Sequence, residues 1–202
     1  MVEAGILLLA FVAGAIPFSN LVARTTKGVD LRDASSGTVS GTSLYRVAGW
    51  WALVASGILD VAKGAIGPLL AGDRPVLAAF AGGLAVAGHN WSPFLRGHGG
   101  RGIAPALGAL LVNAWPGAVV ILVALVASRA FRQTGLGGFV GEVALVPVLT
   151  VTNGPCGALA GGAVAAPMLV KRLVGNARPR ERGWRVYAQR LLFDRDPDIP
   201  SP

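Results

Sequence analysis

A glycine-rich segment that leads into an apolar run is the part of this sequence best suited to binding an anion. The segment reads Gly97-His98-Gly99-Gly100-Arg101-Gly102, and the apolar run begins at Ile103. A helix that starts there would offer unbonded N–H groups and the positive end of its dipole to a phosphate. Arg96 and Arg101 would add charge-assisted hydrogen bonds. The segment therefore predicts a phosphate site, and the competing interpretation is a basic loop at a membrane surface.

A segment rich in serine and glycine, earlier in the chain, is a second candidate. Residues 32–43 carry hydroxyl groups and small side chains, with Ser35, Ser36 and Gly37 near their centre, and Arg46 follows them. Such a backbone can turn several N–H groups toward one anion, and an arginine can complete the charge. The same composition is also typical of a flexible linker.

Ionisable side chains inside apolar stretches form a third candidate. Asp60 and Lys63 are three residues apart, so a helix would place them on one face, where they can pair. His89 ends one apolar stretch just before the glycine-rich segment, and Glu142 lies within a later stretch. Ionisable groups at membrane depth are costly and are functional hypotheses by default. For each of them the alternative is a purely structural contact between helices.

The composition around these candidates is that of a membrane protein. The 202 residues are 53% hydrophobic and only 14% charged, whereas soluble domains carry about 25% charged residues. The formal charge of +8 could suggest a nucleic-acid partner, but Lys and Arg lie between apolar segments and near the C-terminus, which is the pattern of membrane topology. One cysteine and no Cys/His cluster predict neither a disulfide framework nor a metal or other cofactor.

Seven apolar segments predict an all-α bundle of about seven transmembrane helices. They cover residues 4–23, 47–72, 75–95, 103–113, 116–128, 138–152 and 154–170. If the N-terminus is outside, the loops rich in Lys and Arg share the cytoplasmic side with the C-terminus, and Arg74 lies opposite. Glu3 stands where a signal peptide would be basic, which favours a retained first helix. Residues 1–170 are thus a predicted transmembrane domain, and residues 171–202 a predicted basic cytoplasmic tail.

Taken in order, these pieces resemble the bacterial membrane acyl-phosphate:glycerol-3-phosphate acyltransferases, the PlsY family. The most specific match is Gly88-His89-Asn90-Trp91-Ser92-Pro93-Phe94-Leu95, followed by Gly99-Gly100-Arg101-Gly102, in which arginine replaces the lysine of the family. The other matching stretches are residues 14–19, Ser36-Gly37 with Thr42 and Arg46, and residues 60–64.

The resemblance implies a seven-span enzyme of the bacterial inner membrane with its site at the cytoplasmic face. There an acyl group would pass from acyl phosphate to the 1-hydroxyl of glycerol 3-phosphate, giving lysophosphatidate. The implied partners are these two substrates and the lipid bilayer, with no nucleic acid. The implied catalytic residues are Ser36, Arg46, Lys63 and His89. The implied phosphate-binding residues are Ser35, Gly37, Arg96, Gly99, Gly100, Arg101 and Gly102, and the residues that shape the site are Asp60 and Gly64.

Besides Arg101, the chain departs from the family pattern at four further positions. Thr38 and Ser43 stand where the family has asparagine, and Ala166 and Leu169 stand where it has histidine and asparagine. Two other classes of function are therefore compatible with the sequence. One is a catalytically silent paralogue that binds substrate or regulates, and the other is a small transporter that uses the ionisable residues within its helices.

Overall fold

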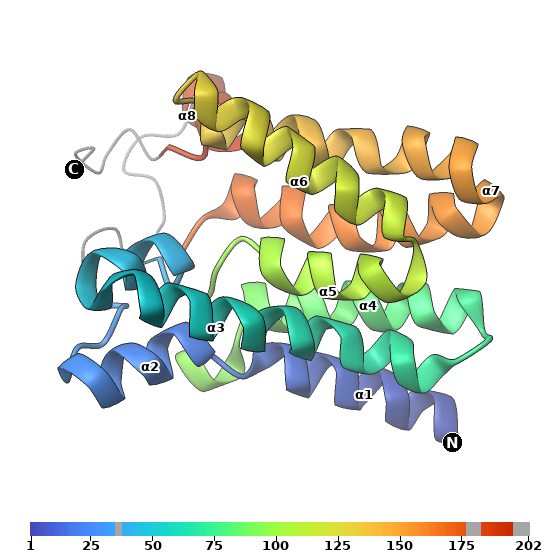
Figure 1. The fold of residues 1–202 in the computed structure, drawn as a ribbon, viewed down its shortest axis with the longest axis horizontal. Helices are drawn as coiled ribbons and strands as arrows, with labels where there is room; N and C mark the ends of the chain where they lie inside the picture. Colours follow the sequence, from blue (N-terminus) through green and yellow to red (C-terminus); the bar gives the residue numbers. More distant parts are fainter. Residues whose placement is uncertain (35–37, 177–182, 196–202) are drawn as a thin grey trace.

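The computed structural model describes residues 1–34, 38–176 and 183–195, and every regular element in these ranges is helical (Figure 1). This confirms the predicted all-α class. The elements in chain order are α1 (Val2–Ala15), α2 (Phe18–Lys27), α3 (Gly41–Ala71), α4 (Pro75–Asn90), the short 3₁₀ helix η1 (Pro93–Leu95), α5 (Ile103–Asn113), α6 (Trp115–Ala130), α7 (Thr134–Val174) and α8 (Trp184–Phe193).

The first predicted helix is interrupted where Ile16 precedes Pro17. Ile16 is extended, with φ −60° and ψ 119°, so residues 4–23 form most of α1 and the first part of α2 rather than one continuous helix. The ring of a proline disfavours a helical conformation at the preceding residue, and proline has no N–H to donate. The break exposes the Ile16 carbonyl to a side chain from another helix, as described below.

Two glycines interrupt the longest helices. Gly49 in α3 has φ 82° and ψ −172°, and Gly154 in α7 has φ 64° and ψ −154°. Positive φ values of this kind are accessible mainly to glycine. Helix α7 doubles back at Gly154, so that its two arms run side by side (Figure 1). The break coincides with the predicted boundary between residues 138–152 and 154–170.

Small residues allow the helices around α4 and α5 to pack closely. A Cβ atom on Gly14 of α1 would overlap the backbone of Ala85 in α4. One on Gly64 of α3 would overlap the backbone of Pro105 in α5. Close approach through small residues is the usual packing of membrane helices. Helix α4 contacts α1, α3, α5 and α7, which makes it a central helix of the bundle.

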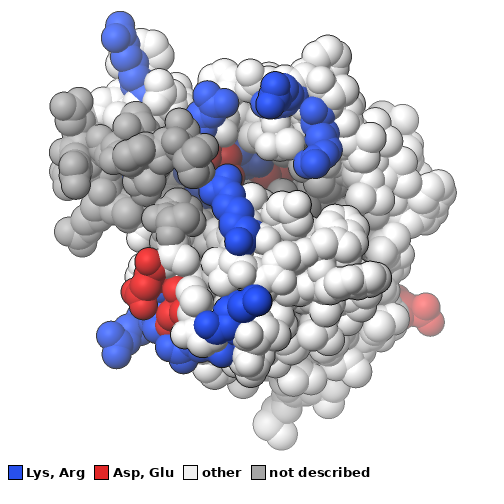
Figure 2. Space-filling view, turned by 60° about the vertical axis from the view of Figure 1, so that its left-hand side comes forward, with Lys and Arg blue, Asp and Glu red and all other residues white. Residues whose placement is uncertain are grey.

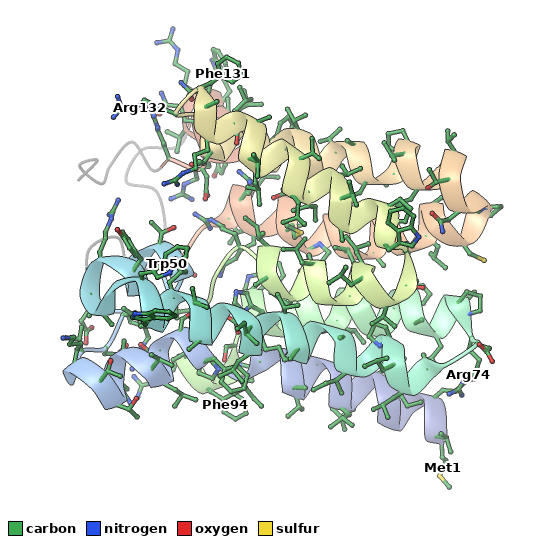
Figure 3. The ribbon with its side chains drawn as sticks, in the orientation of Figure 1. Met1, Trp50, Arg74, Phe94, Phe131 and Arg132 are labelled. Atoms are coloured by element: carbon green, nitrogen blue, oxygen red, sulfur yellow. The ribbon has the colours of Figure 1, made fainter. Side chains whose placement is uncertain are left out.

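In the described parts of the chain, three helical stretches are long and apolar enough to cross a membrane: Val2–Lys27, Gly41–Ala71 and Thr134–Val174. Charged side chains gather at one end of the bundle. Figure 2 turns this end forward and shows Lys and Arg around a hollow that contains charged atoms of both signs. Arg74 lies near Met1 at the opposite end from Arg132 (Figure 3).

The beginning of the predicted basic tail belongs to the helical bundle. Helix α7 continues to Val174, and Lys171 and Arg172 are only 1% and 2% exposed. The sequence suggested a solvated segment because basic residues follow one another there. The structure differs because both side chains reach inward to polar groups of other elements. Helix α8 packs on the end of α7, where Arg190 donates to the carbonyl of Val174 at 3.0 Å.

Candidate active site

A small cavity lies where the α1–α2 break meets α3, α4 and the glycine-rich segment. Its volume is about 10 Å³, which is room for roughly one water molecule. The sequence-predicted residues Lys63, His89, Gly99 and Gly100 all border it, together with Asp60. The remaining lining residues are Ala15, Ile16, Pro17, Phe18, Ser19, Val39, Ser92 and Leu95.

Lys63 is held in this cavity by three contacts. Its Nζ lies 2.7 Å from Asp60 Oδ1, which confirms the predicted pair, and it donates to the Ile16 carbonyl at 2.6 Å. The ring of Phe18 lies under the same ammonium group, 5.6 Å from Nζ to the ring centroid. The side chains of Lys63 and Asp60 are only 2% and 6% exposed. The broken first helix therefore supplies a carbonyl and an aromatic face that fix a buried cation.

His89 lies between this ion pair and the glycine-rich segment. Its Nδ1 is 3.8 Å from Asp60 Oδ1. Its carbonyl accepts a hydrogen bond of 3.4 Å from the Gly100 N–H. A Cβ atom on Gly100 would overlap Nε2 of the imidazole, and one on Gly99 would overlap the His89 carbonyl. Both glycines are needed here because the segment packs directly on the histidine.

The N–H groups of the glycine-rich segment are only partly available to a ligand. Those of Gly97 and Gly100 donate to the carbonyls of Ser92 and His89, at 2.8 and 3.4 Å. The Gly99 N–H donates to Asn176 Oδ1 at 3.3 Å. The N–H groups of residues 101–104 donate to nothing within the described parts of the chain. The N–H groups free to bind an anion are therefore those at the N-terminus of α5, where the sequence predicted a helix start.

The two arginines beside this segment differ in their surroundings. Arg101 Nε forms an ion pair of 2.5 Å with Asp194 Oδ1, which follows α8, and Arg101 Nη1 donates to the Lys171 carbonyl at 3.2 Å. Arg96 is exposed and has a left-handed backbone, with φ 55°. Within the described residues, Arg96 makes no side-chain hydrogen bond or ion pair. The charge that the sequence assigned to phosphate binding is thus already partly neutralised at Arg101.

The structure also brings polar residues to the site that the sequence analysis did not single out. Asn90 is completely buried, donates to the Pro167 carbonyl at 2.8 Å, and has no hydrogen-bond partner for Oδ1. Asn176 makes a second bond to the glycine-rich segment, from Nδ2 to the Gly99 carbonyl at 3.0 Å. Lys171 lies beneath the same segment. Asn90 could have been suspected because it follows His89 directly, but Asn176 and Lys171 are remote in sequence.

Helix α7 presents a different face to the site from the one that the resemblance suggested. Ala166, which stands at the family's histidine position, is exposed, and Leu169 packs against the apolar core. The inward face instead carries Met168 and Lys171, which are each 1% exposed. Residues three apart on a helix share a face. Lys171 is therefore the polar side chain that this face of α7 directs toward the glycine-rich segment, whereas Arg172 points to Glu142.

Glu142 and Arg172 form a buried ion pair near the site. Arg172 Nε lies 2.9 and 2.8 Å from the two carboxylate oxygens, and Nη1 donates to the Gly135 carbonyl at 3.1 Å. The side chains are 1% and 2% exposed. This pair joins the two arms of α7, so the geometry favours the structural interpretation of Glu142 over an ion path.

The structure describes only part of the serine- and glycine-rich segment. Ser35, Ser36 and Gly37 lie outside the described residues, and Arg46 is exposed without an ion pair in the described chain. Just before the segment, Asp30 forms ion pairs of 2.6 Å with Arg24 and 2.7 Å with Arg32. The hydrogen bonds from Arg32 hold the pKa of Asp30 well below its usual range.

Comparison with known proteins identifies the family. The sequence model of the glycerol-3-phosphate acyltransferase family matches residues 4–179. Glycerol-3-phosphate acyltransferase 4 of Dehalococcoides mccartyi strain CBDB1 is 39% identical, in an alignment that covers 95% of this chain and 87% of that relative. Glycerol-3-phosphate acyltransferase 5 of strain ATCC BAA-2266 / KCTC 15142 / 195 is 38% identical over 138 residues, which cover 67% of this chain but only 59% of that relative.

The fold has a counterpart among solved structures. The crystal structure of PlsY (YgiH), an integral membrane glycerol 3-phosphate acyltransferase in its glycerol 3-phosphate form, superposes with a TM-score of 0.76 at 27% identity. The match covers 84% of this chain and 88% of that chain. The sequence model, the relatives and this structure agree, and the chain therefore belongs to the glycerol-3-phosphate acyltransferase family.

Proposed function

We propose that this protein transfers an acyl group from acyl phosphate to the 1-hydroxyl of glycerol 3-phosphate, giving lysophosphatidate and inorganic phosphate. Acyl transfer to glycerol 3-phosphate follows from membership of the family. The observation that carries the proposal is the grouping of Lys63, His89 and Gly99-Gly100 around one cavity, next to the unbonded N–H groups of α5. Two phosphorylated substrates need such a concentration of cations and N–H donors.

The reaction needs no nucleophile from the protein. Acyl phosphate is an activated mixed anhydride, so the 1-hydroxyl oxygen of glycerol 3-phosphate can attack its carbonyl carbon directly. The new ester bond forms as the bond between that carbon and the phosphate oxygen breaks, and inorganic phosphate leaves with the bonding electrons. The protein contributes by holding the two substrates in line and by stabilising negative charge on the carbonyl oxygen.

His89 is the proposed acceptor of the hydroxyl proton, and Lys63 the proposed electrostatic contact. The imidazole borders the cavity, and the carboxylate of Asp60 lies 3.8 Å from its Nδ1. An imidazole at the wall of the cavity can accept the proton of a bound hydroxyl, as a general base does. Lys63 is fixed at the same cavity by Asp60 and Ile16. Ser36, Arg46 and the serine- and glycine-rich segment remain proposed contacts to substrate.

The same proposal includes the membrane topology. We place about seven spans in the bacterial inner membrane, with the N-terminus outside and with residues 171–202 as a basic cytoplasmic extension of the domain of residues 1–170. The gathering of Lys and Arg at one end supports this orientation, because cytoplasmic loops are rich in these residues (Figure 2). Reporter fusions after residues 73, 98 and 202 should read outside, inside and inside, and an outside reading at 202 would contradict the topology.

The function is tested with purified protein in detergent, supplied with acyl phosphate and glycerol 3-phosphate. Lysophosphatidate and inorganic phosphate should appear in equal amounts, and His89→Ala should lower the rate by roughly 100-fold or more. A wild-type protein that binds glycerol 3-phosphate but makes no lysophosphatidate would contradict the proposal and indicate a silent paralogue. Lys27→Met is the matched control, since Lys27 is exposed at the end of α2.

A further inference from the structure

We propose that Lys171, near the end of α7, binds the phosphate group of a substrate beside the N–H groups that open α5. The inference rests on the proposed acyl transfer and adds a phosphate-binding residue to it. It starts from an imbalance of charge beneath the glycine-rich segment, where the buried Lys171 has no carboxylate partner among the described residues.

The surroundings of Lys171 are poor in negative charge. The residue is 1% exposed, and its Nζ lies 3.5 Å from the Gly97 carbonyl and 5.4 Å from the centroid of the Trp91 ring. Within the part of the chain that the structure describes, it forms no ion pair with a carboxylate. Burying a cation without a counter-ion is costly, and one carbonyl and one aromatic face compensate only in part. A phosphate would supply the missing charge.

The neighbouring cations do have carboxylate partners. Lys63 pairs with Asp60, and Arg172 pairs with Glu142. Even Arg101, which the sequence suggested as the main phosphate contact, pairs with Asp194. Among the described residues beside the glycine-rich segment, Lys171 and the exposed Arg96 therefore keep positive charge for a ligand, and of these two Lys171 is the buried one.

The backbone of Lys171 lies close to the residues that carry the unbonded N–H groups. Its own carbonyl accepts a hydrogen bond of 3.2 Å from Arg101 Nη1, and a Cβ atom on Gly102 would lie 3.3 Å from the side chain of Met168. Met168 and Lys171 share the inward face of α7. One side of the proposed phosphate site is thus the start of α5, and the other is this face of α7. A buried lysine would complement the amide groups with a full charge.

The test compares Lys171→Met, Lys171→Arg and the exposed-site control Lys27→Met. The KM for acyl phosphate and the KM for glycerol 3-phosphate are measured separately, so the substrate whose phosphate contacts Lys171 is identified by the KM that changes. Lys171→Met should raise that KM roughly 10- to 100-fold, the effect of losing a hydrogen bond to a charged group. Lys171→Arg should recover most of the loss, and the control should match wild type. If Lys171→Met lowered kcat and thermal stability with both KM values unchanged, Lys171 would be structural and the inference would be wrong.

A measurement on wild-type protein does not depend on the folding of a Lys171 variant. Phosphate at Nζ should change the emission of Trp91, so titration with inorganic phosphate or glycerol 3-phosphate should give a saturable change that is lost in Trp91→Phe. An active enzyme without this change would overturn the role of Lys171. A protein that shows the change but no acyl transfer would contradict the proposed function and leave the phosphate site intact.

Discussion

Replacing Gly100 by alanine should lower kcat/KM for acyl transfer by roughly 100-fold. The added methyl group would overlap Nε2 of His89, and restoring ordinary contact requires a shift on the order of 1 Å in one of the two residues. A misplacement of about 1 Å can cost about 100-fold in rate, which corresponds to about 2.7 kcal/mol of transition-state stabilisation. The effect arises from position alone, because the substitution alters no charge and no titratable group.

The assay is the formation of lysophosphatidate by purified variants at matched concentrations of folded protein. Gly57→Ala is the control, because Gly57 lies inside α3 and no heavy atom outside its own helix lies within 4 Å of the added carbon. It should leave kcat/KM unchanged. A Gly100→Ala variant with kcat/KM within threefold of wild type would refute the placement of His89 against the glycine-rich segment.

Three further predictions concern ion pairs. Glu142→Ala should destabilise the protein by about 3 kcal/mol or more in detergent unfolding assays, because it leaves a buried arginine uncompensated, whereas Glu3→Ala at an exposed site should not. Asp194→Asn should release Arg101 and lower the KM for a phosphorylated substrate about threefold; a higher KM would mean that Asp194 positions Arg101 instead. Asp30 has a lowered pKa, so its stabilisation is present above about pH 4 and is lost as the pH falls further. The thermal midpoint of Asp30→Asn should therefore lie below that of wild type at pH 6, and the difference should begin to narrow as the pH is lowered below about 4.

Local features of the fold and site could be predicted from the sequence. The pairing of Asp60 with Lys63 needs only a helix, because residues three apart share a face. An interruption between two apolar runs predicted the reversal of the chain at Gly154. The glycine-rich segment before Ile103 predicted the start of α5. Each of these depends on residues close together in the chain.

Contacts between distant residues could not be predicted in this way. Lys63 donates a hydrogen bond to the carbonyl of Ile16, 47 residues away in sequence, because Pro17 interrupts the helix directly after Ile16. The sequence predicts that the basic pair Lys171-Arg172 begins a tail, because nothing in the neighbouring sequence indicates that Arg172 contacts Glu142. Charge near the end of an apolar run is ambiguous until the packing of the other helices is known.

The central claim is that both substrates are bound together and that the acyl group passes directly between them. Initial rates of lysophosphatidate formation, measured over a matrix of acyl phosphate and glycerol 3-phosphate concentrations, test it most directly. Direct transfer predicts double-reciprocal lines that intersect. Parallel lines, with a trapped acyl-enzyme, would show a covalent intermediate on the protein and would contradict the account.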